Sequence, residues 1–126
     1  MKINNPTIYI FMNKSLGMSA GKLAAQAAHA AALVDTRSNW LDNAHRTILV
    51  MQARDEAHIR SIKEYIGDRG FNSHIIIDEG VNEIDPHTVT ALATDIVDRL
   101  DGHTQATFST FELYSDTIRL SIEVDR

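Results

Sequence analysis

The fold of this chain is decided by one stretch, Leu16-Gly17-Met18-Ser19-Ala20-Gly21-Lys22-Leu23-Ala24-Ala25-Gln26-Ala27-Ala28-His29-Ala30. It has the pattern of a glycine-marked loop that runs into an alanine-rich helix. At 100° per residue, Lys22, Gln26 and His29 fall on one narrow side of that helix, at spacings of four and three residues. The other positions are mostly Ala, Leu and Val, which suit a helix packed closely against a sheet. Three polar side chains thus share one face of a helix that is otherwise predicted to be buried.

Composition indicates one globular domain over residues 1–126, with 44% hydrophobic and 23% charged residues. The absence of cysteine excludes a disulfide framework, a thiolate zinc site and a thiol nucleophile. Acidic residues outnumber basic ones by 17 to 12, which argues against a general nucleic-acid binder, so a basic patch would have to be assembled by folding. The first residues lack a signal-peptide core and no apolar run reaches membrane-spanning length. We expect a soluble, cytoplasmic protein without a membrane segment.

Apolar runs of strand length alternate with helical patterns along the chain. Strands are predicted over residues 7–12, 47–51, 71–77 and 88–93, and helices over residues 19–34, 56–68 and 95–100, the last one stopping near Gly102. This alternation is typical of an α/β layered domain.

The end of the chain has a different pattern. Ile118, Leu120, Ile122 and Val124 alternate with polar residues at a period of two, and Phe111 and Leu113 precede them across a polar turn. We therefore predict a C-terminal β-hairpin over residues 106–125, added to a core of residues 7–104.

The candidate chemistry lies in the loops that follow the first and third strands. In open α/β sheets, ligands bind at the carboxyl ends of strands, and Lys22 and Asp78 each follow such an end. If those two strands are parallel neighbours, the two side chains converge. Asp78 directly ends an Ile-Ile-Ile run, where a carboxylate is partly shielded and its pKa can be tuned for acid–base work.

Several other kinds of site are excluded or disfavoured. The segment from Gly17 to Lys22 is one residue too short for a P-loop, and Leu23 stands where Ser or Thr would hold magnesium. The six histidines show no metal-ligand spacing, the acidic loop after Asp78 is no EF-hand, and no Gly-x-Ser-x-Gly elbow occurs. Plainer interpretations remain open at this point: a tight glycine turn, a solvated Lys22, and a core histidine at His29, which we favour over a ligand or a base on the residues alone.

Two separate motifs resemble the type 2 peptidyl-tRNA hydrolase family. The segment from Gly21 to Ala30 is similar to the signature helix of that family, and Ile76-Ile77-Asp78-Glu79-Gly80 followed by Ile84-Asp85-Pro86-His87-Thr88-Val89-Thr90 is similar to its second block. The resemblance covers roughly residues 7–104. It implies a mixed four-stranded sheet flanked by helices, usually in a homodimer, that hydrolyses the ester between a peptide and the tRNA 3′ end without a metal or cofactor.

The resemblance also implies roles for individual residues. Lys22 and Asp78 correspond to the catalytic pair, while Gln26, His29, Asn82, Thr88 and Thr90 would bind substrate. The chain departs from the family pattern at four positions: Val81 replaces a frequent basic residue, Asn82 a threonine that supports the aspartate, His87 a glycine, and Glu83 adds a negative charge.

Our leading hypothesis is a peptidyl-tRNA hydrolase, in which Lys22 stabilises the oxyanion or binds a phosphate and Asp78 orients or deprotonates a water. The alternative is a non-catalytic binding module on the same fold with a protein partner. A third hypothesis is a small-substrate hydrolase or transferase that uses the helix start for an anion.

Overall fold

The computed structural model describes residues 7–35, 47–80, 85–97 and 102–114. A single mixed sheet has the strand order β2-β1-β4-β3, formed by β1 (Thr7–Asn13), β2 (Thr47–Ala53), β3 (Ser73–Asp78) and β4 (Thr88–Thr94). β1 and β2 are parallel, and β4 runs antiparallel to both β1 and β3. The mixed four-stranded α/β fold expected from the sequence is confirmed.

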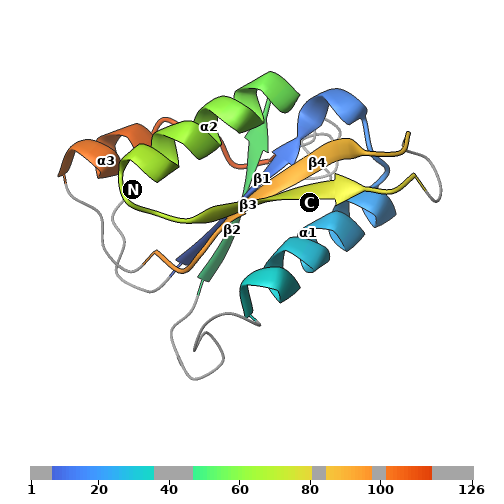
Figure 1. Ribbon diagram of the computed structural model, residues 1–126, viewed down its shortest axis with the longest axis horizontal. Coiled ribbons are helices and arrows are strands. Elements are labelled where there is room, and N and C mark those ends of the chain that lie inside the picture. The colour runs from blue at the N-terminus through green and yellow to red at the C-terminus, as the bar shows by residue number, and fades with distance from the viewer. Residues whose placement is uncertain (1–6, 36–46, 81–84, 98–101, 115–126) are drawn as a thin grey trace, which may run out of the picture.

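Helices cover both faces of this sheet (Figure 1). α1 (Ala20–Asp35) packs on one face against Ile8, Ile10 and Met12 of β1. α2 (Glu56–Asp68) and the short α3 (Gly102–Phe108) lie on the other face with Tyr9 and Phe11. Successive side chains of a strand point to opposite faces, so β1, which is buried along its whole length, supplies both halves of the core.

Local sequence explains where the two long helices begin. Ser19 caps α1: its carbonyl accepts from Leu23 N–H at 2.8 Å and its hydroxyl from Lys22 N–H at 3.3 Å. Asp55 caps α2 in the same way, since its side chain accepts from His58 N–H at 2.8 Å. Before α1, the 3₁₀ turn η1 (Lys14–Leu16) ends at Gly17, whose φ of 58° lies in the left-handed region. The sequence therefore places Lys22 in the first turn of α1.

Three expectations from the sequence need correction. The helix predicted over residues 95–100 is wrong where the structure describes it, because Val97 pairs with Thr7 in extended conformation and Gly102 begins a helix instead of ending one. The predicted hairpin differs at its start, since residues up to Phe108 belong to α3 and Leu113 bridges to Met51. Residues 115–126, which hold the rest of that hairpin, lie outside the described residues, and the division into core and extension stays a prediction.

The third correction concerns α1, where the alanines at positions 24, 25, 28 and 32 are exposed, so one side of this helix faces outward. In the described part of the chain, no helix is both long and apolar enough to cross a membrane.

Candidate active site

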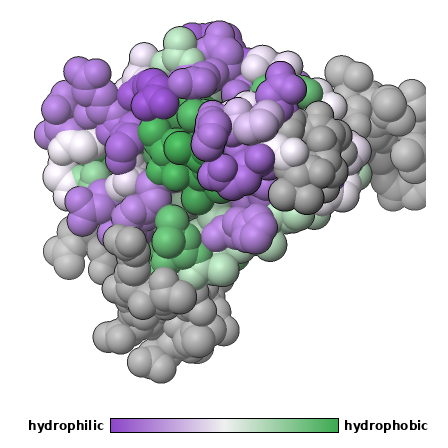
Figure 2. All heavy atoms as spheres, turned by 45° about the vertical axis from the view of Figure 1, so that its right-hand side comes forward, coloured by the Kyte–Doolittle hydropathy of each residue, from purple (hydrophilic) through white to green (hydrophobic). Residues whose placement is uncertain are grey.

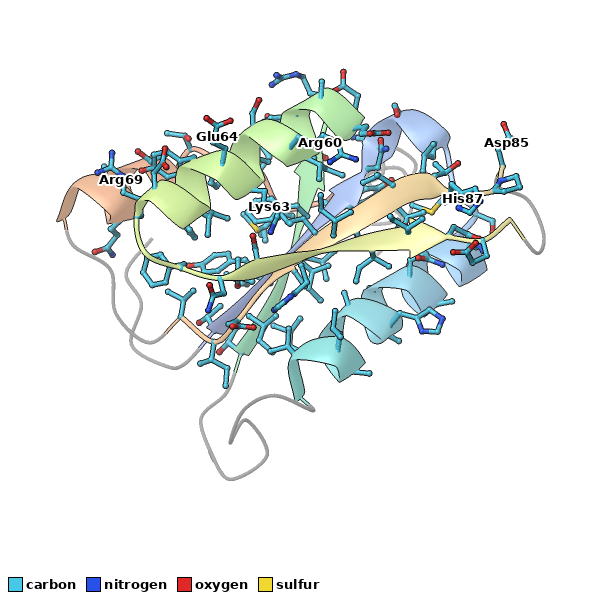
Figure 3. All side chains as sticks on the ribbon, viewed as in Figure 1. Arg60, Lys63, Glu64, Arg69, Asp85 and His87 are labelled. Carbon is cyan, nitrogen blue, oxygen red and sulfur yellow. The ribbon has the colours of Figure 1, made fainter. Side chains whose placement is uncertain are left out.

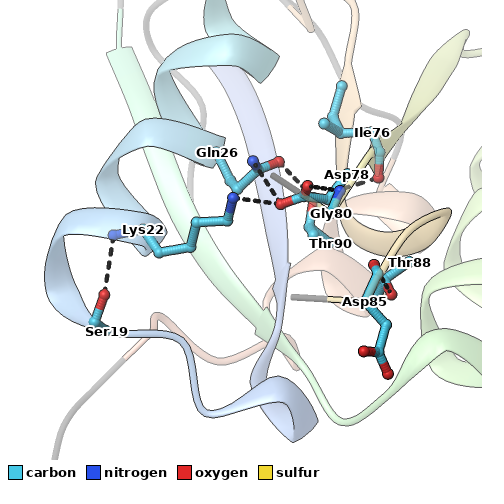
Figure 4. Close-up of polar contacts among 9 residues, drawn as sticks. All are labelled: Ser19, Lys22, Gln26, Ile76, Asp78, Gly80, Asp85, Thr88 and Thr90. Atoms are coloured by element: carbon cyan, nitrogen blue, oxygen red, sulfur yellow. Dashed lines mark hydrogen bonds and ion pairs between the residues drawn. The ribbon is translucent and has the colours of Figure 1, made fainter. Parts of the chain in front are cut away.

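Lys22 and Asp78 form an ion pair at the carboxyl end of β3, between Lys22 Nζ and Asp78 Oδ2 (Figure 4). Their side chains are only 9% and 4% exposed. The two residues converge as expected, but by another route than neighbouring strands. β1 and β3 are parallel to each other with β4 between them, and α1 reaches across the sheet to bring Lys22 to Asp78. The interpretation of Lys22 as a merely solvated lysine is therefore wrong.

Both oxygens of the Asp78 carboxylate are occupied. Oδ1 accepts from Gly80 N–H at 2.6 Å, an Asx turn, and Oδ2 accepts from Lys22 and from Gln26 Nε2 at 3.4 Å. The hydrogen bond from Lys22, followed by that from Gly80, holds the pKa of Asp78 below its usual value, against the opposing effect of burial. Asp78 is therefore an anchored carboxylate at neutral pH.

Gly80 is a site residue that was not among the candidates predicted from the sequence. Its φ is 80°, and a Cβ at this position would lie 2.6 Å from the backbone nitrogen of Pro86. Only glycine fits both the conformation and the space, so Gly80 fixes the turn that donates to Asp78. The Asp-x-Gly sequence directly after a strand was the available signal, because this spacing is typical of Asx turns.

A chain of hydrogen bonds continues behind the ion pair. The Thr90 hydroxyl donates to Gln26 Oε1 at 2.7 Å and also lies 3.3 Å from the Ile76 carbonyl oxygen. Thr90 is fully buried, so the structure places it behind Gln26 and not on the cleft surface. By holding Oε1, it turns the amide nitrogen of Gln26 toward Asp78.

A β-bulge positions Thr90. The register of β3 and β4 shifts from Ile76 opposite Ala91 to Ile77 opposite Val89, which leaves Thr90 without a partner across the ladder. Bulges re-aim side chains in this manner, and the sequence carries no visible signal for one here.

The remaining predicted substrate-binding residues lie in different places. His29 is exposed on α1 at the cleft, so the favoured interpretation of a core histidine is wrong. Thr88 is half-buried, and its hydroxyl donates to the Asp85 carbonyl at 2.6 Å (Figure 4). Asn82, with Val81 and Glu83, lies outside the described residues. His87, which stands at a usual glycine position, has a φ of 61°, and this left-handed conformation accounts for a glycine preference there.

The ion pair opens into a cleft of about 670 Å³ between α1 and β3. This volume falls in the range of small-molecule sites, about 300–1,000 Å³. From α1, the cleft is lined by Gly21, Lys22, Ala25, Gln26, His29 and Leu33. From β3 and its end, it is lined by Ile76, Ile77, Asp78 and Glu79.

The charges around the cleft are unevenly distributed. Arg60 belongs to α2, which covers the opposite face of the sheet, and Arg69 directly follows this helix (Figure 3). Lys14 and Arg54 are exposed and directly follow β1 and β2. These strands are parallel to β3, so both basic residues lie at the carboxyl ends of the strands, the same end of the sheet as Asp78.

Within the four described segments, no three His, Cys, Asp or Glu side chains gather closely enough to hold one metal ion.

Comparison with known proteins identifies the family of the chain. Residues 7–106 match the family model described as peptidyl-tRNA hydrolase PTH2. A peptidyl-tRNA hydrolase of Thermoplasma acidophilum is 34% identical over 103 residues, covering 73% of this chain and 87% of the relative. Those of Pyrobaculum aerophilum and Methanopyrus kandleri are 32% and 30% identical, each covering 74% of this chain and 90% of the relative. The chain belongs to the peptidyl-tRNA hydrolase PTH2 family.

Proposed function

We propose that this protein is a peptidyl-tRNA hydrolase that cleaves the ester between a peptide and the 3′ end of tRNA. The observation that carries the proposal is the shielded ion pair of Lys22 and Asp78 at the end of an open cleft. Family membership and the named relatives support the same substrate class.

Lys22 is the group that stabilises negative charge. Its ammonium lies in the cleft with a side chain that is 9% exposed, where screening by water is weak. As water adds to the ester carbonyl carbon, charge develops on the carbonyl oxygen, and a fixed cation beside that oxygen lowers the barrier. The carbon–oxygen bond to the ribose then breaks. The ribose oxygen leaves with one proton of the attacking water, and the other proton passes to solvent, giving free tRNA and a peptide carboxylate.

Asp78 orients the side chains beside it and does not deprotonate the attacking water. An effective general base has a pKa near the working pH, whereas Lys22 and Gly80 hold the pKa of Asp78 below its usual value. Both of its oxygens already accept hydrogen bonds, so its contribution is to fix Lys22 and the Gln26 amide. Gln26 Nε2 and His29 are the groups at the cleft that can contact the ester or the attacking water. Asn82 and Thr88 belong to the proposal as substrate-binding residues.

The test follows release of free tRNA from an N-acetyl-aminoacyl-tRNA. We expect Lys22→Ala to lower kcat/KM by about 10²–10³-fold, the effect of removing one oxyanion-stabilising group. Arg60→Ala is the matched control, because it removes an exposed cation from α2 on the other face of the sheet. If the wild type and Lys22→Ala are equally inert, the enzyme proposal fails and the binding module becomes the better hypothesis.

A homodimer, which the resemblance implies, and a location in the cytoplasm, which the sequence led us to expect, complete the proposal. Sedimentation equilibrium of the purified protein tests the dimer, and fractionation of cells that express the tagged chain tests the location.

A further inference from the structure

The outer edge of β3 is open in the part of the chain that the structure describes. β3 is a terminal strand of the order β2-β1-β4-β3, and its ladder partner is β4 on the inner side. The other terminal strand, β2, is covered. Gln52 N–H donates to the Glu112 carbonyl, and Tyr114 N–H donates to the Val50 carbonyl, both at 2.9 Å.

Backbone groups of β3 point alternately toward β4 and away from the sheet, and the hydrogen bonds show which residues do which. The Asn72 carbonyl accepts from Asp95 N–H at 3.0 Å, so alternate residues from Asn72 onward pair with β4. Ile75 therefore directs its N–H and C=O away from the sheet. Ser73 also directs its backbone groups away from the sheet. Its carbonyl already accepts a hydrogen bond from Lys63 Nζ at 2.6 Å, so this end of the β3 edge is occupied. The open part runs from Ile75 toward Asp78.

A groove runs beside the last part of this open edge, at Ile76 and Ile77, and ends at the ion pair. It is the cleft of about 670 Å³ described above, with α1 as one wall and β3 as the other. Leu33 lines the end away from the ion pair, and Ile77 at the edge is 49% exposed. In the view of Figure 2, hydrophobic surface forms a patch bordered by hydrophilic residues.

The groove has the length of a short peptide. At about 1.5 Å rise per residue, Leu33 lies about 16 Å from Lys22 along α1. An extended chain advances about 3.3 Å per residue, so about five residues fit between the ion pair and Leu33.

We propose that this groove binds the peptide part of the substrate, in an extended conformation beside β3. The inference rests on the proposed hydrolase function, because the ester ties the carboxyl end of the peptide to the place where Lys22 and Asp78 lie. β3 also runs toward Asp78, so the bound peptide is parallel to β3 and its residues extend back toward Leu33. Backbone hydrogen bonds to a strand edge do not depend on side chains, which suits a substrate whose peptide sequence varies.

The experiment compares two substrates that differ only in peptide length: N-acetyl-aminoacyl-tRNA with one residue and an N-acetylated five-residue peptidyl-tRNA. We expect kcat/KM of the wild type to be about tenfold higher for the longer substrate. Leu33→Glu places a charge in the groove and should reduce this ratio to below about twofold. Ala32→Glu is the matched control, since Ala32 is the exposed neighbour outside the groove and should keep the full ratio.

Other results overturn the proposal. A wild-type ratio near one, or equal ratios for Leu33→Glu and Ala32→Glu, removes the peptide groove but leaves the hydrolase function standing. If Leu33→Glu and the milder Leu33→Ser both lose activity equally on the two substrates, Leu33 has only a structural role. If Leu33→Glu turns a dimer into a monomer without changing the ratio, a second copy of the chain occupies the groove. A wild type that cleaves neither substrate overturns the hydrolase function itself.

Discussion

The Thr90 hydroxyl donates a 2.7 Å hydrogen bond to Gln26 Oε1, joining the centre of β4 to the buried side of α1. Gln26 in turn directs its amide nitrogen to Asp78, so Thr90 acts on the ion pair through an intermediate side chain. This fully buried hydroxyl supports the proposed catalytic arrangement without touching the cleft.

Thr90→Val tests this positioning role. Valine keeps the shape but leaves Gln26 Oε1 without its donor, which costs about 1–3 kcal/mol of stability for a buried polar group. We expect kcat to fall about tenfold with little change in KM, because the Gln26 amide loses its orientation while the rest of the cleft stays in place. Thr90→Ser restores the hydroxyl and should recover most of kcat. A purely structural role would leave kcat of the folded Thr90→Val enzyme unchanged, as measured by single-turnover kinetics.

Gly80→Ala tests the turn that holds Asp78. A methyl group would collide with Pro86 and strain the positive φ, so the turn must shift and its N–H moves away from Asp78 Oδ1. We expect kcat/KM for tRNA release to fall more than about tenfold, the loss of one charge-assisted hydrogen bond of about 1.5–3 kcal/mol. Gly67→Ala is the control, because α2 has space for a Cβ there, and it should leave activity unchanged. Equal activities of the two variants would contradict the prediction.

The pH dependence of stability reports on Asp78. Lys22 and Gly80 lower the pKa of Asp78 in the folded protein, so the unfolded chain binds this proton more readily. The stabilisation is fully present above the ordinary carboxyl pKa of about 3.9, and it is lost as the pH falls through the folded-state value. We expect the difference in unfolding free energy between the wild type and Asp78→Asn to be constant from pH 5 upward and to shrink below about pH 4. Urea denaturation at each pH measures it, with the exposed Asp68→Asn as the control for a surface charge. Parallel curves for the wild type and Asp78→Asn across this range would refute the prediction.

His87 carries backbone strain beside the site. Its φ of 61° costs a non-glycine residue about 1–2 kcal/mol, and its exposed imidazole lies 3.5 Å from Glu79. His87→Gly and His87→Ala both remove the imidazole, but only glycine relieves the strain. We expect His87→Gly to be about 1 kcal/mol more stable than His87→Ala in urea unfolding, after the entropic cost of glycine. Identical stabilities would show that the loop relaxes around position 87.

Lys14 and Arg54 are placed to meet RNA phosphates. Both are exposed and lie at the carboxyl ends of the strands, the end of the sheet that carries the ion pair. Lys14→Gln and Arg54→Gln should each raise KM for peptidyl-tRNA. Each should also reduce the slope of log KM against the logarithm of the salt concentration by about 0.7–0.9, the effect of one lost phosphate contact. Arg69→Gln, directly after the end of α2, is the matched control and should change neither quantity. The same salt slope for all three variants would place the tRNA on another face.

Local sequence determined much of this protein because capping, turn and periodicity signals act over a few residues. Ser19 caps the start of α1, and the Asp-x-Gly sequence forms the turn at Asp78. Helical spacing alone places Lys22, Gln26 and His29 on one side of α1. The helix predicted over residues 95–100 failed for a reason outside that range, since pairing of Val97 with Thr7 depends on a strand far away in the chain.

Tertiary structure alone decided how these pieces meet. The insertion of β4 between β1 and β3 is a long-range pairing that no local pattern encodes, and it makes α1 cross the sheet to bring Lys22 to Asp78. The bulge opposite Ile76 turns the Thr90 hydroxyl toward Gln26, and the terminal place of β3 leaves the groove beside it open. The sequence by itself determined which side chains could form the site. Strand order and register depend on pairing between distant segments, and they decided that Lys22, Gln26, Asp78 and Thr90 lie in contact with one another.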